Sequence, residues 1–170
     1  MNKSTQQAQV DDFFLRKAYQ YAREQSTDPS TQNFAIIVDP RDNCIISQGP
    51  NRFPKGVHES PMRWERPLKY SYVEHAARNA IYAAARQGIS TFKTVMYCPW
   101  FACADCARGI IEAGISEVVG HAASIHKSRP DWQKSIDVAL DMLCEAGVKL
   151  RYVDGHLGCS IRFDGNIVTV

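Results

Sequence analysis

The chain has 170 residues, 45% of them hydrophobic, which is enough apolar material to bury the core of one domain. A formal net charge of +2 argues against a dedicated polynucleotide-binding protein, because such proteins carry a concentrated excess of basic residues. The mostly polar residues 1–9 lack the core of a signal peptide, and no apolar run approaches the ~20 residues that span a bilayer. We therefore expect a cytoplasmic protein that does not enter a membrane.

Helices and strands are predicted to alternate along most of the chain. We expect residues 1–10 to be disordered and an amphipathic helix to follow over Asp11–Gln25. The apolar run Phe34–Val38 and the segment Cys44–Ser47 flank a turn and predict a hairpin of two strands. A loop rich in glycine and proline occupies Gly49–Ser71, and loops of that length inside a domain are usually functional or disordered. The later elements are helices over Tyr72–Arg86, Cys103–Ala113 and Trp132–Ala146, and strands over Thr94–Tyr97, Glu117–Val119, Lys149–Val153, Ile161–Phe163 and Ile167–Val170.

This order of elements, a helix and a hairpin followed by strands that alternate with helices, predicts an α/β fold. No internal repeat or linker divides the sequence, so we expect a single domain over residues 1–170. The expected architecture is a sandwich with one mixed sheet and helices on both of its faces.

The cysteines suggest a metal site. In a chain without an export signal, the six cysteines are expected to be reduced thiols or metal ligands. Cys103 and Cys106 lie three residues apart in the first turn of a predicted helix, so both sulfur atoms can reach one ion, and the helix N-terminus favours thiolates. His75, near the start of another predicted helix, would complete a set of three protein ligands. Three ligands plus water is the arrangement of catalytic zinc, whereas structural zinc normally has four protein ligands.

Each part of this site, taken alone, also has an interpretation that does not involve a metal. A lone CxxC pair at a helix start is also typical of thioredoxin-like redox proteins, and an isolated histidine is commonly an ordinary core or surface residue. A thioredoxin-like fold would place the pair much nearer the N-terminus and would not need His75. The combination of His75 with the CxxC pair therefore favours zinc.

The segment that starts at His75 and the segment that contains Cys103 and Cys106 together resemble the signature of the cytidine and deoxycytidylate deaminase superfamily. That signature is H-x-E followed by P-C-x-x-C. The two segments run His75-Ala76-Ala77 and Cys103 to Cys106 in this sequence. The stretches GPNRFPKG over 49–56 and CARGIIEAGI over 106–115 resemble the dCMP deaminase branch. The resemblance implies a cytidine deaminase-like, three-layer α/β/α sandwich around a mixed five-stranded sheet. It also implies one catalytic Zn²⁺ per chain, bound by His75, Cys103 and Cys106, a small-molecule nucleotide substrate and a homo-oligomer.

Further site residues follow from the same resemblance and from position. Asn51 is expected to contact the sugar or base of the substrate, and the backbone around Ala76 and Ala77 to line the base pocket. Trp100 and Phe101 lie beside the first cysteine of the pair and are expected to line the pocket. Cations that could meet a substrate phosphate are expected in the long loop and before the last helix, and the candidates are Arg52, Lys55, Arg63, Arg66, Lys69, Lys127 and Arg129.

The sequence departs from the family pattern at two positions. Ala102 replaces the proline before the first cysteine, and Pro99 lies three residues earlier. More importantly, Ala77 stands where the family has its catalytic glutamate, which moves protons between the zinc-bound water and the cytosine ring. Glu74 is a poor substitute, because it lies about 4.5 Å nearer the helix N-terminus at ~1.5 Å per residue. Loss of the general acid/base should cost at least ~10²–10⁴ in rate, so we expect this chain to be inactive.

The predicted function is zinc-dependent hydrolytic deamination of a cytosine nucleotide, dCMP first, to the uracil nucleotide and ammonia. We favour an engineered Glu-to-Ala replacement at position 77, because every other expected part of the site is intact. Two alternatives stay open. One is a deaminase that acts on another base or nucleotide, including a tRNA position, and the other is a natural non-catalytic nucleotide-binding relative.

Overall fold

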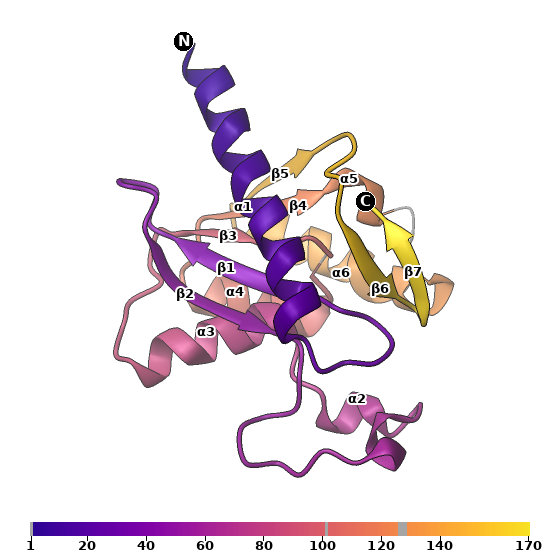
Figure 1. Cartoon of the computed structure of the whole chain (residues 1–170). Helices are drawn as coiled ribbons and strands as arrows, with labels where there is room; N and C mark the ends of the chain where they lie inside the picture. The colour runs from indigo at the N-terminus through magenta and orange to yellow at the C-terminus, as the bar shows by residue number, and fades with distance from the viewer. Residues whose placement is uncertain (1, 101, 126–128) are drawn as a thin grey trace.

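A mixed five-stranded sheet forms the centre of the protein, as expected, with the strand order β2-β1-β3-β4-β5 (Figure 1). The computed structural model describes residues 2–100, 102–125 and 129–170. Strand β1 pairs in antiparallel fashion with β2 and β3, whereas β3, β4 and β5 are parallel neighbours. The strands are β1 Phe34–Val38, β2 Ile45–Pro50, β3 Val95–Tyr97, β4 Glu117–His121 and β5 Lys149–Val153.

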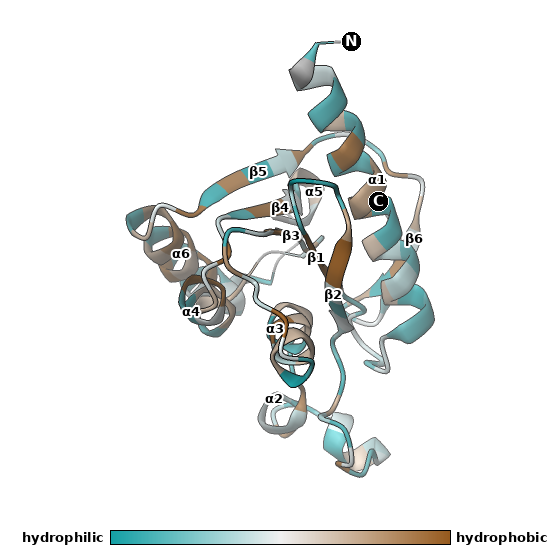
Figure 2. Cartoon of the chain, turned by 90° about the vertical axis from the view of Figure 1, so that its left-hand side faces the viewer, coloured by the Kyte–Doolittle hydropathy of each residue, from teal (hydrophilic) through white to brown (hydrophobic). Residues whose placement is uncertain are grey.

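Helices cover both faces of the sheet, which gives the expected three layers (Figure 2). One face packs against α1, and the opposite face packs against α3, α4 and α6. The continuous apolar run of β1 is explained by this position, because all five of its residues are buried between the two helical layers. The helices that form the layers are α1 Lys3–Gln25, α3 Ala76–Arg86, α4 Ala104–Glu112 and α6 Pro130–Glu145. None of the described helices is both long and apolar enough to span a membrane.

The N-terminal helix corrects one expectation. Residues 1–10 were expected to be disordered, but α1 begins at Lys3. Asn2 caps the helix by accepting a hydrogen bond from the backbone N–H of Ser4. One turn later, the side chain of Gln7 donates to Asp11 over 2.9 Å. These local contacts stabilise the first turns of the helix.

The helix predicted over Tyr72–Arg86 also begins later than expected. The backbone of Glu74 pairs with Arg52 in an isolated antiparallel bridge, which keeps the chain extended up to His75. Helix α3 therefore starts at Ala76, and His75 is its N-cap residue. The preceding long loop contains a 3₁₀ turn over Pro61–Trp64 and the short helix α2 over Lys69–Tyr72. Because α3 starts at Ala76, His75 lies at the N-terminus of the helix.

A separate two-stranded hairpin completes the chain (Figure 1). It consists of β6 Ser160–Phe163 and β7 Asn166–Thr169, joined by the expected Asp164-Gly165 turn. Both turn residues have positive φ, 49° and 82°, as a two-residue hairpin turn of type I′ requires. Apolar side chains of the hairpin pack with those of α1. Its backbone also bonds to the loop before β1, where Ser30 accepts from Gly165 over 2.9 Å.

Candidate metal centre and active site

Three side chains converge between the first turns of α3 and α4. His75 is the N-cap of α3, Cys103 is the N-cap of α4, and Cys106 lies one turn further along α4. The two sulfur atoms are 3.7 Å apart. The Nδ1 atom of His75 lies 3.3 Å from Cys103 Sγ and 3.5 Å from Cys106 Sγ. Among the described residues, this is the one group of three or more histidine, cysteine or acidic side chains close enough to hold a metal ion.

The spacing of the three donors fits a zinc ion. Zinc bound tetrahedrally at about 2.3 Å from sulfur and about 2.05 Å from nitrogen places two sulfurs about 3.8 Å apart and sulfur about 3.6 Å from nitrogen. The observed separations of 3.7, 3.3 and 3.5 Å agree with these values to within about 0.3 Å. Two thiolates and one imidazole are also the donor types that zinc prefers.

The charge state of the two thiols favours a cation. The hydrogen bond with Cys106 lowers the pKa of the Cys103 thiol to about 4, although burial opposes this shift. The same hydrogen bond, together with burial, raises the pKa of Cys106. The pair therefore carries one negative charge and one shared proton, and a divalent ion that replaces the proton would neutralise two thiolates. Cys98, a third buried thiol nearby, has its pKa raised to about 12 by burial and remains protonated.

The three donors lie in the wall of a pocket of about 160 Å³. The pocket is bounded by the first turns of α3 and α4, the loop before β1, α2, the start of α6 and the tip of the β6–β7 hairpin. Its apolar lining includes Val73, Ala76, Ala77, Trp100, Ala102, Trp132, Ile136 and Phe163. Its polar lining includes Asp28, Thr31, Asn33, Asn51, Arg66, Lys69, Arg129 and Asp164.

A family model for the cytidine and deoxycytidylate deaminase zinc-binding region matches residues 8–122. The chain belongs to this family. The uncharacterized deaminase in the luxG 3′ region of Aliivibrio fischeri is 38% identical over 131 residues, which are 75% of this chain and 83% of that protein. The deoxycytidylate deaminase of Mus musculus is 36% identical over 126 residues, which are 69% of this chain and 67% of that protein.

Solved structures of the family show the same fold. The dCMP deaminase from the cyanophage S-TIM5 in apo form superimposes with a TM-score of 0.66 at 21% identity, covering 90% of this chain and 100% of that one. The same cyanophage enzyme in complex with dCMP and dUMP gives a TM-score of 0.63 at 21% identity, covering 90% and 99%. At this level of identity the likeness supports the cytidine deaminase-like architecture and says nothing about ligands of this chain.

Position 77, where the resemblance implies a catalytic glutamate, is occupied by a small apolar residue. Ala77 is 2% exposed and lines the pocket two residues after His75. Glu74 does not line the pocket, because its carboxylate accepts hydrogen bonds from the backbone of His75 over 3.0 Å and from Arg78 over 2.6 Å. The carboxylates in the described part of the lining are Asp28 and Asp164, and each is held in an ion pair. Each of these three acids is therefore held by a partner within the described residues.

The aromatic lining agrees only in part with expectation. Trp100 is buried in the pocket wall, donates its Nε1–H to the Gln32 carbonyl, and stacks on Phe163 with centroids 4.0 Å apart. Phe101 lies outside the described residues. Phe163 and Trp132 also line the pocket, which was not expected from the sequence, and the ring centroid of Trp132 lies 5.9 Å from that of His75. No local signal marks these two residues, because the long-range fold brings them to the pocket.

Asn51 lines the pocket, but its amide is already fully hydrogen-bonded. Its Oδ1 atom accepts from Ser26 and from the backbone of Asn33, both over 2.7 Å. Its Nδ2 group donates to Asp28 over 3.1 Å and to the carbonyl of Thr31 over 2.6 Å. Asn51 therefore holds the loop before β1 in place, and a direct contact with substrate remains a prediction.

The expected cations at Arg52 and Lys55 do not reach the pocket. The backbone of Arg52 is fixed by its bridge to Glu74, and Lys55 is exposed on the long loop. Of the other expected cations, Arg66, Lys69 and Arg129 line the pocket, Arg63 does not, and Lys127 lies outside the described residues. Successive side chains alternate in direction along extended backbone, which accounts for Asn51 lining the pocket while its neighbour Arg52 does not.

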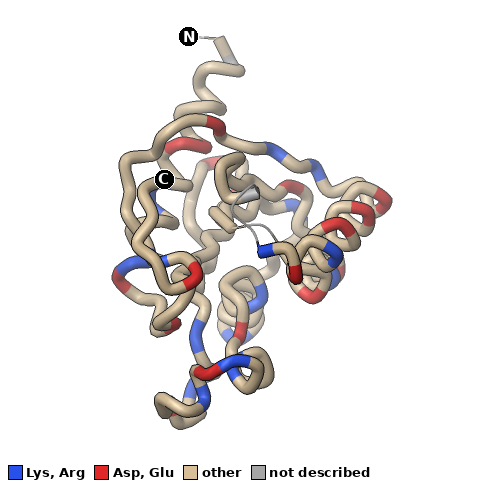
Figure 3. Tube along the Cα trace, turned by 90° about the vertical axis from the view of Figure 1, so that its right-hand side faces the viewer, with Lys and Arg blue, Asp and Glu red and all other residues tan. Residues whose placement is uncertain are grey.

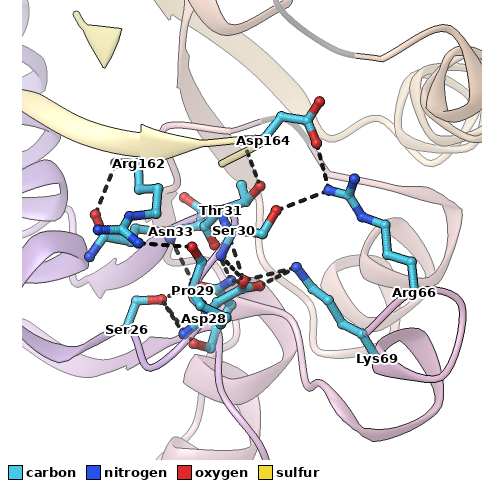
Figure 4. Close-up of polar contacts among 12 residues, drawn as sticks. Ser26, Asp28, Pro29, Ser30, Thr31, Asn33, Arg66, Lys69, Arg162 and Asp164 are labelled. Atoms are coloured by element: carbon cyan, nitrogen blue, oxygen red, sulfur yellow. Dashed lines mark hydrogen bonds and ion pairs between the residues drawn. The ribbon is translucent and has the colours of Figure 1, made fainter. Parts of the chain in front are cut away.

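Lys69 belongs to a buried ion pair that braces the pocket (Figure 4). Its Nζ atom lies 2.7 Å from Asp28 Oδ2, and the two side chains are 6% and 2% exposed. Asp28 also accepts backbone hydrogen bonds from Ser30 over 2.8 Å and Thr31 over 3.0 Å. This arrangement ties α2 to the loop before β1 and leaves Arg66 and Arg129 as the pocket cations that are not fully buried.

Proposed function

We propose that this fold is that of a zinc-dependent deaminase that converts a cytosine nucleotide such as dCMP to the uracil nucleotide and ammonia. We further propose that this chain, with Ala77, is an inactive form of it. The observation that carries the proposal is the zinc-compatible spacing of His75, Cys103 and Cys106 in the wall of a pocket. The deoxycytidylate deaminases among the relatives support cytosine as the base.

The residues of the site have separable roles in this proposal. A bound zinc ion would supply a water ligand acidic enough to be hydroxide near neutral pH. The apolar wall of Val73, Trp100 and Phe163 would exclude bulk water and flank the planar base. The reaction forms a bond between C4 of cytosine and the water oxygen and breaks the bond from C4 to the amine, which leaves as ammonia.

Position 77 decides whether the reaction can proceed. A glutamate there would take a proton from the attacking water and deliver protons to N3 and to the leaving amine. Ala77 has no titratable group, and Glu74 is held by Arg78. We infer that the alanine is an engineered replacement, because it keeps the start of α3 and every metal ligand while it removes only the proton carrier.

The distribution of charge supports a small ligand. In the view of Figure 3, basic and acidic positions are interspersed along the chain, and no long stretch of the described trace is uniformly basic. The pocket itself contains both signs of charge. A polynucleotide partner would instead favour a continuous basic stripe.

Restoring the glutamate tests the proposal. The Ala77→Glu protein should release ammonia from dCMP at least ~10²–10⁴ times faster than the present chain, with about one zinc per chain by elemental analysis. The matched control is Ala85→Glu, which adds the same charge at an exposed position of the same helix and should remain inactive. Activity on only an adenine or guanine nucleotide would move the proposal to another base. Bound zinc without turnover of any nucleotide would favour a non-catalytic binding protein.

The expected homo-oligomer is a separate part of the proposal. Its support is the family resemblance, and a molar mass from light scattering tests it. A mass of one chain would remove this part without affecting the deaminase assignment.

A further inference from the structure

Two arginines of the pocket share a single carboxylate. Arg66 comes from the long loop and Arg129 immediately precedes α6, and both line the pocket. Asp164, at the tip of the β6–β7 hairpin, lies between them: its Oδ1 atom is 2.6 Å from Arg66 Nη2 and 3.7 Å from Arg129 Nη1. Figure 4 shows the Arg66 guanidinium directed at both Asp164 and Ser30. Three segments that are distant in sequence therefore meet at one anion.

Arg129 is incompletely satisfied by this arrangement. Its Nε and Nη2 atoms donate to Asp131 over 3.0 and 2.6 Å. Its Nη1 atom is buried and has no hydrogen-bond partner within the described part of the chain. The separation of 3.7 Å from Asp164 exceeds hydrogen-bonding distance. A buried charged donor without an acceptor is unfavourable, so a ligand oxygen at this point would be stabilising.

The chemistry of the group favours a phosphate as that ligand. Guanidinium groups bind phosphate through paired hydrogen bonds, and the oxygens of a phosphate can serve two arginines better than the one shared oxygen of Asp164. The third cation of the pocket, Lys69, is already neutralised by the buried carboxylate of Asp28. A ligand phosphate would therefore depend on Arg66 and Arg129.

The hairpin allows Asp164 to release the arginines without moving its backbone. The backbone N–H of Asp164 donates to Thr31 Oγ1 over 3.2 Å, and that of Gly165 donates to the Ser30 carbonyl over 2.9 Å. These bonds fix the tip on the loop before β1. The carboxylate itself is 36% exposed and needs only a rotation of its side chain to leave the arginines.

We propose that Arg66 and Arg129 bind the 5′-phosphate of a nucleoside monophosphate and that Asp164 competes with this phosphate for them. The proposal rests on the proposed function, since it assumes that the pocket takes a nucleotide. Asp164 also limits the ligand to one phosphate, because further phosphates would meet this carboxylate and that of Asp131, which lies 2.6 Å from Arg129. The hairpin is thus the specificity element of the pocket.

The test is calorimetric binding of deoxycytidine, dCMP and dCTP to the zinc-loaded chain, which with Ala77 is expected not to consume them. dCMP should bind at least about tenfold more tightly than deoxycytidine, and Arg66→Met should abolish that difference. Asp164→Asn should bind dCMP about two- to fivefold more tightly, gain more than this for dCTP, and leave deoxycytidine unchanged. Asparagine suits this position because it tolerates the positive φ of 49°. The matched control is Asp141→Asn at an exposed site on α6, which should change nothing.

Each of the following outcomes would refute a specific part of this proposal. If Asp164→Asn leaves dCMP affinity unchanged or weakens it, Asp164 is not a competitor. If Arg66→Met weakens deoxycytidine and dCMP equally, Arg66 has only a structural role in the pocket. Equal affinities of the present chain for deoxycytidine and dCMP would reject the phosphate site while the cytosine pocket stands. Failure of the zinc-loaded chain to bind any of the three ligands would reject the proposed function and this inference with it.

Discussion

The buried pair of Asp28 and Lys69 should be a structural brace, and its removal should cost stability before it affects ligand binding. Breaking a buried ion pair by deleting one partner typically costs about 3–5 kcal/mol, because the remaining charge is left without compensation. Asp28→Ala also strands the N–H groups of Ser30, Thr31 and the Asn51 amide, so its cost should lie near the upper end, about 5 kcal/mol. Lys69→Met leaves the carboxylate with these three donors and should cost about 3 kcal/mol.

The double variant provides the sharper measurement. Asp28→Ala combined with Lys69→Met leaves neither charge buried, so its cost should be at least about 2 kcal/mol smaller than the sum of the two single costs. Urea unfolding followed by circular dichroism gives the three free energies of unfolding. Lys134→Met, at an exposed position on α6, is the control and should stay within about 0.5 kcal/mol of the parent. Strictly additive costs would refute the role of the pair as a brace. A Lys69→Met variant that loses less than about 1 kcal/mol of stability yet loses dCMP affinity would also refute it, and would make Lys69 a ligand cation.

Three further predictions concern packing, thiols and alkaline pH. Gly49→Ala should cost about 1–3 kcal/mol in urea unfolding, because its Cβ would lie 2.9 Å from a backbone nitrogen of α3, whereas Gly120→Ala, with its nearest contact at 3.5 Å, should cost less than about 1 kcal/mol. After chelation, mass spectrometry should find that Cys103 is alkylated before Cys98 among the buried thiols, since the pKa of Cys103 is lowered to about 4 and that of Cys98 is raised to about 12. Added zinc should protect Cys103. Burial raises the pKa of Tyr19, so the folded protein keeps a proton that the unfolded chain loses above a pH of about 10. The free energy of unfolding should therefore fall above that pH by up to about 1.4 kcal/mol per pH unit, and Tyr19→Phe should remove this contribution.

The close approach of the two cysteines in the candidate metal site could be predicted because their geometry is encoded locally. A CxxC pair in a first helical turn aligns two sulfurs whatever surrounds it, and the sulfurs of Cys103 and Cys106 are accordingly 3.7 Å apart. The alternation of strands and helices likewise fixed the α/β class, since it reflects which segments must bury apolar residues. These features depend on periodicity and spacing, which a single sequence displays.

The rest of the pocket depends on contacts between distant segments. Which of the seven candidate cations line the pocket follows from how distant segments of the chain meet, and charge patterning alone does not contain that information. The start of α3 was misplaced for a similar reason, because the bridge between Arg52 and Glu74 overrides local helix propensity. The hairpin turn was predicted from its Asp-Gly pair, but nothing near Asp164 in the sequence indicates that it faces two arginines.

The candidate metal donors and the hairpin residues of the pocket come from separate parts of the sequence. The three candidate metal donors are contained within residues 75–106, whereas Phe163 and Asp164, which also line the pocket, come from β6 and the turn after it. The hairpin is not a strand of the main sheet, and backbone bonds such as Gly165 to Ser30 join it to the loop before β1. If the pocket has the proposed function, changes confined to this hairpin would alter which ligands bind and would leave the three candidate metal donors in place. A library randomised at the hairpin tip, with its buried apolar residues kept, is a direct route to new ligand preferences.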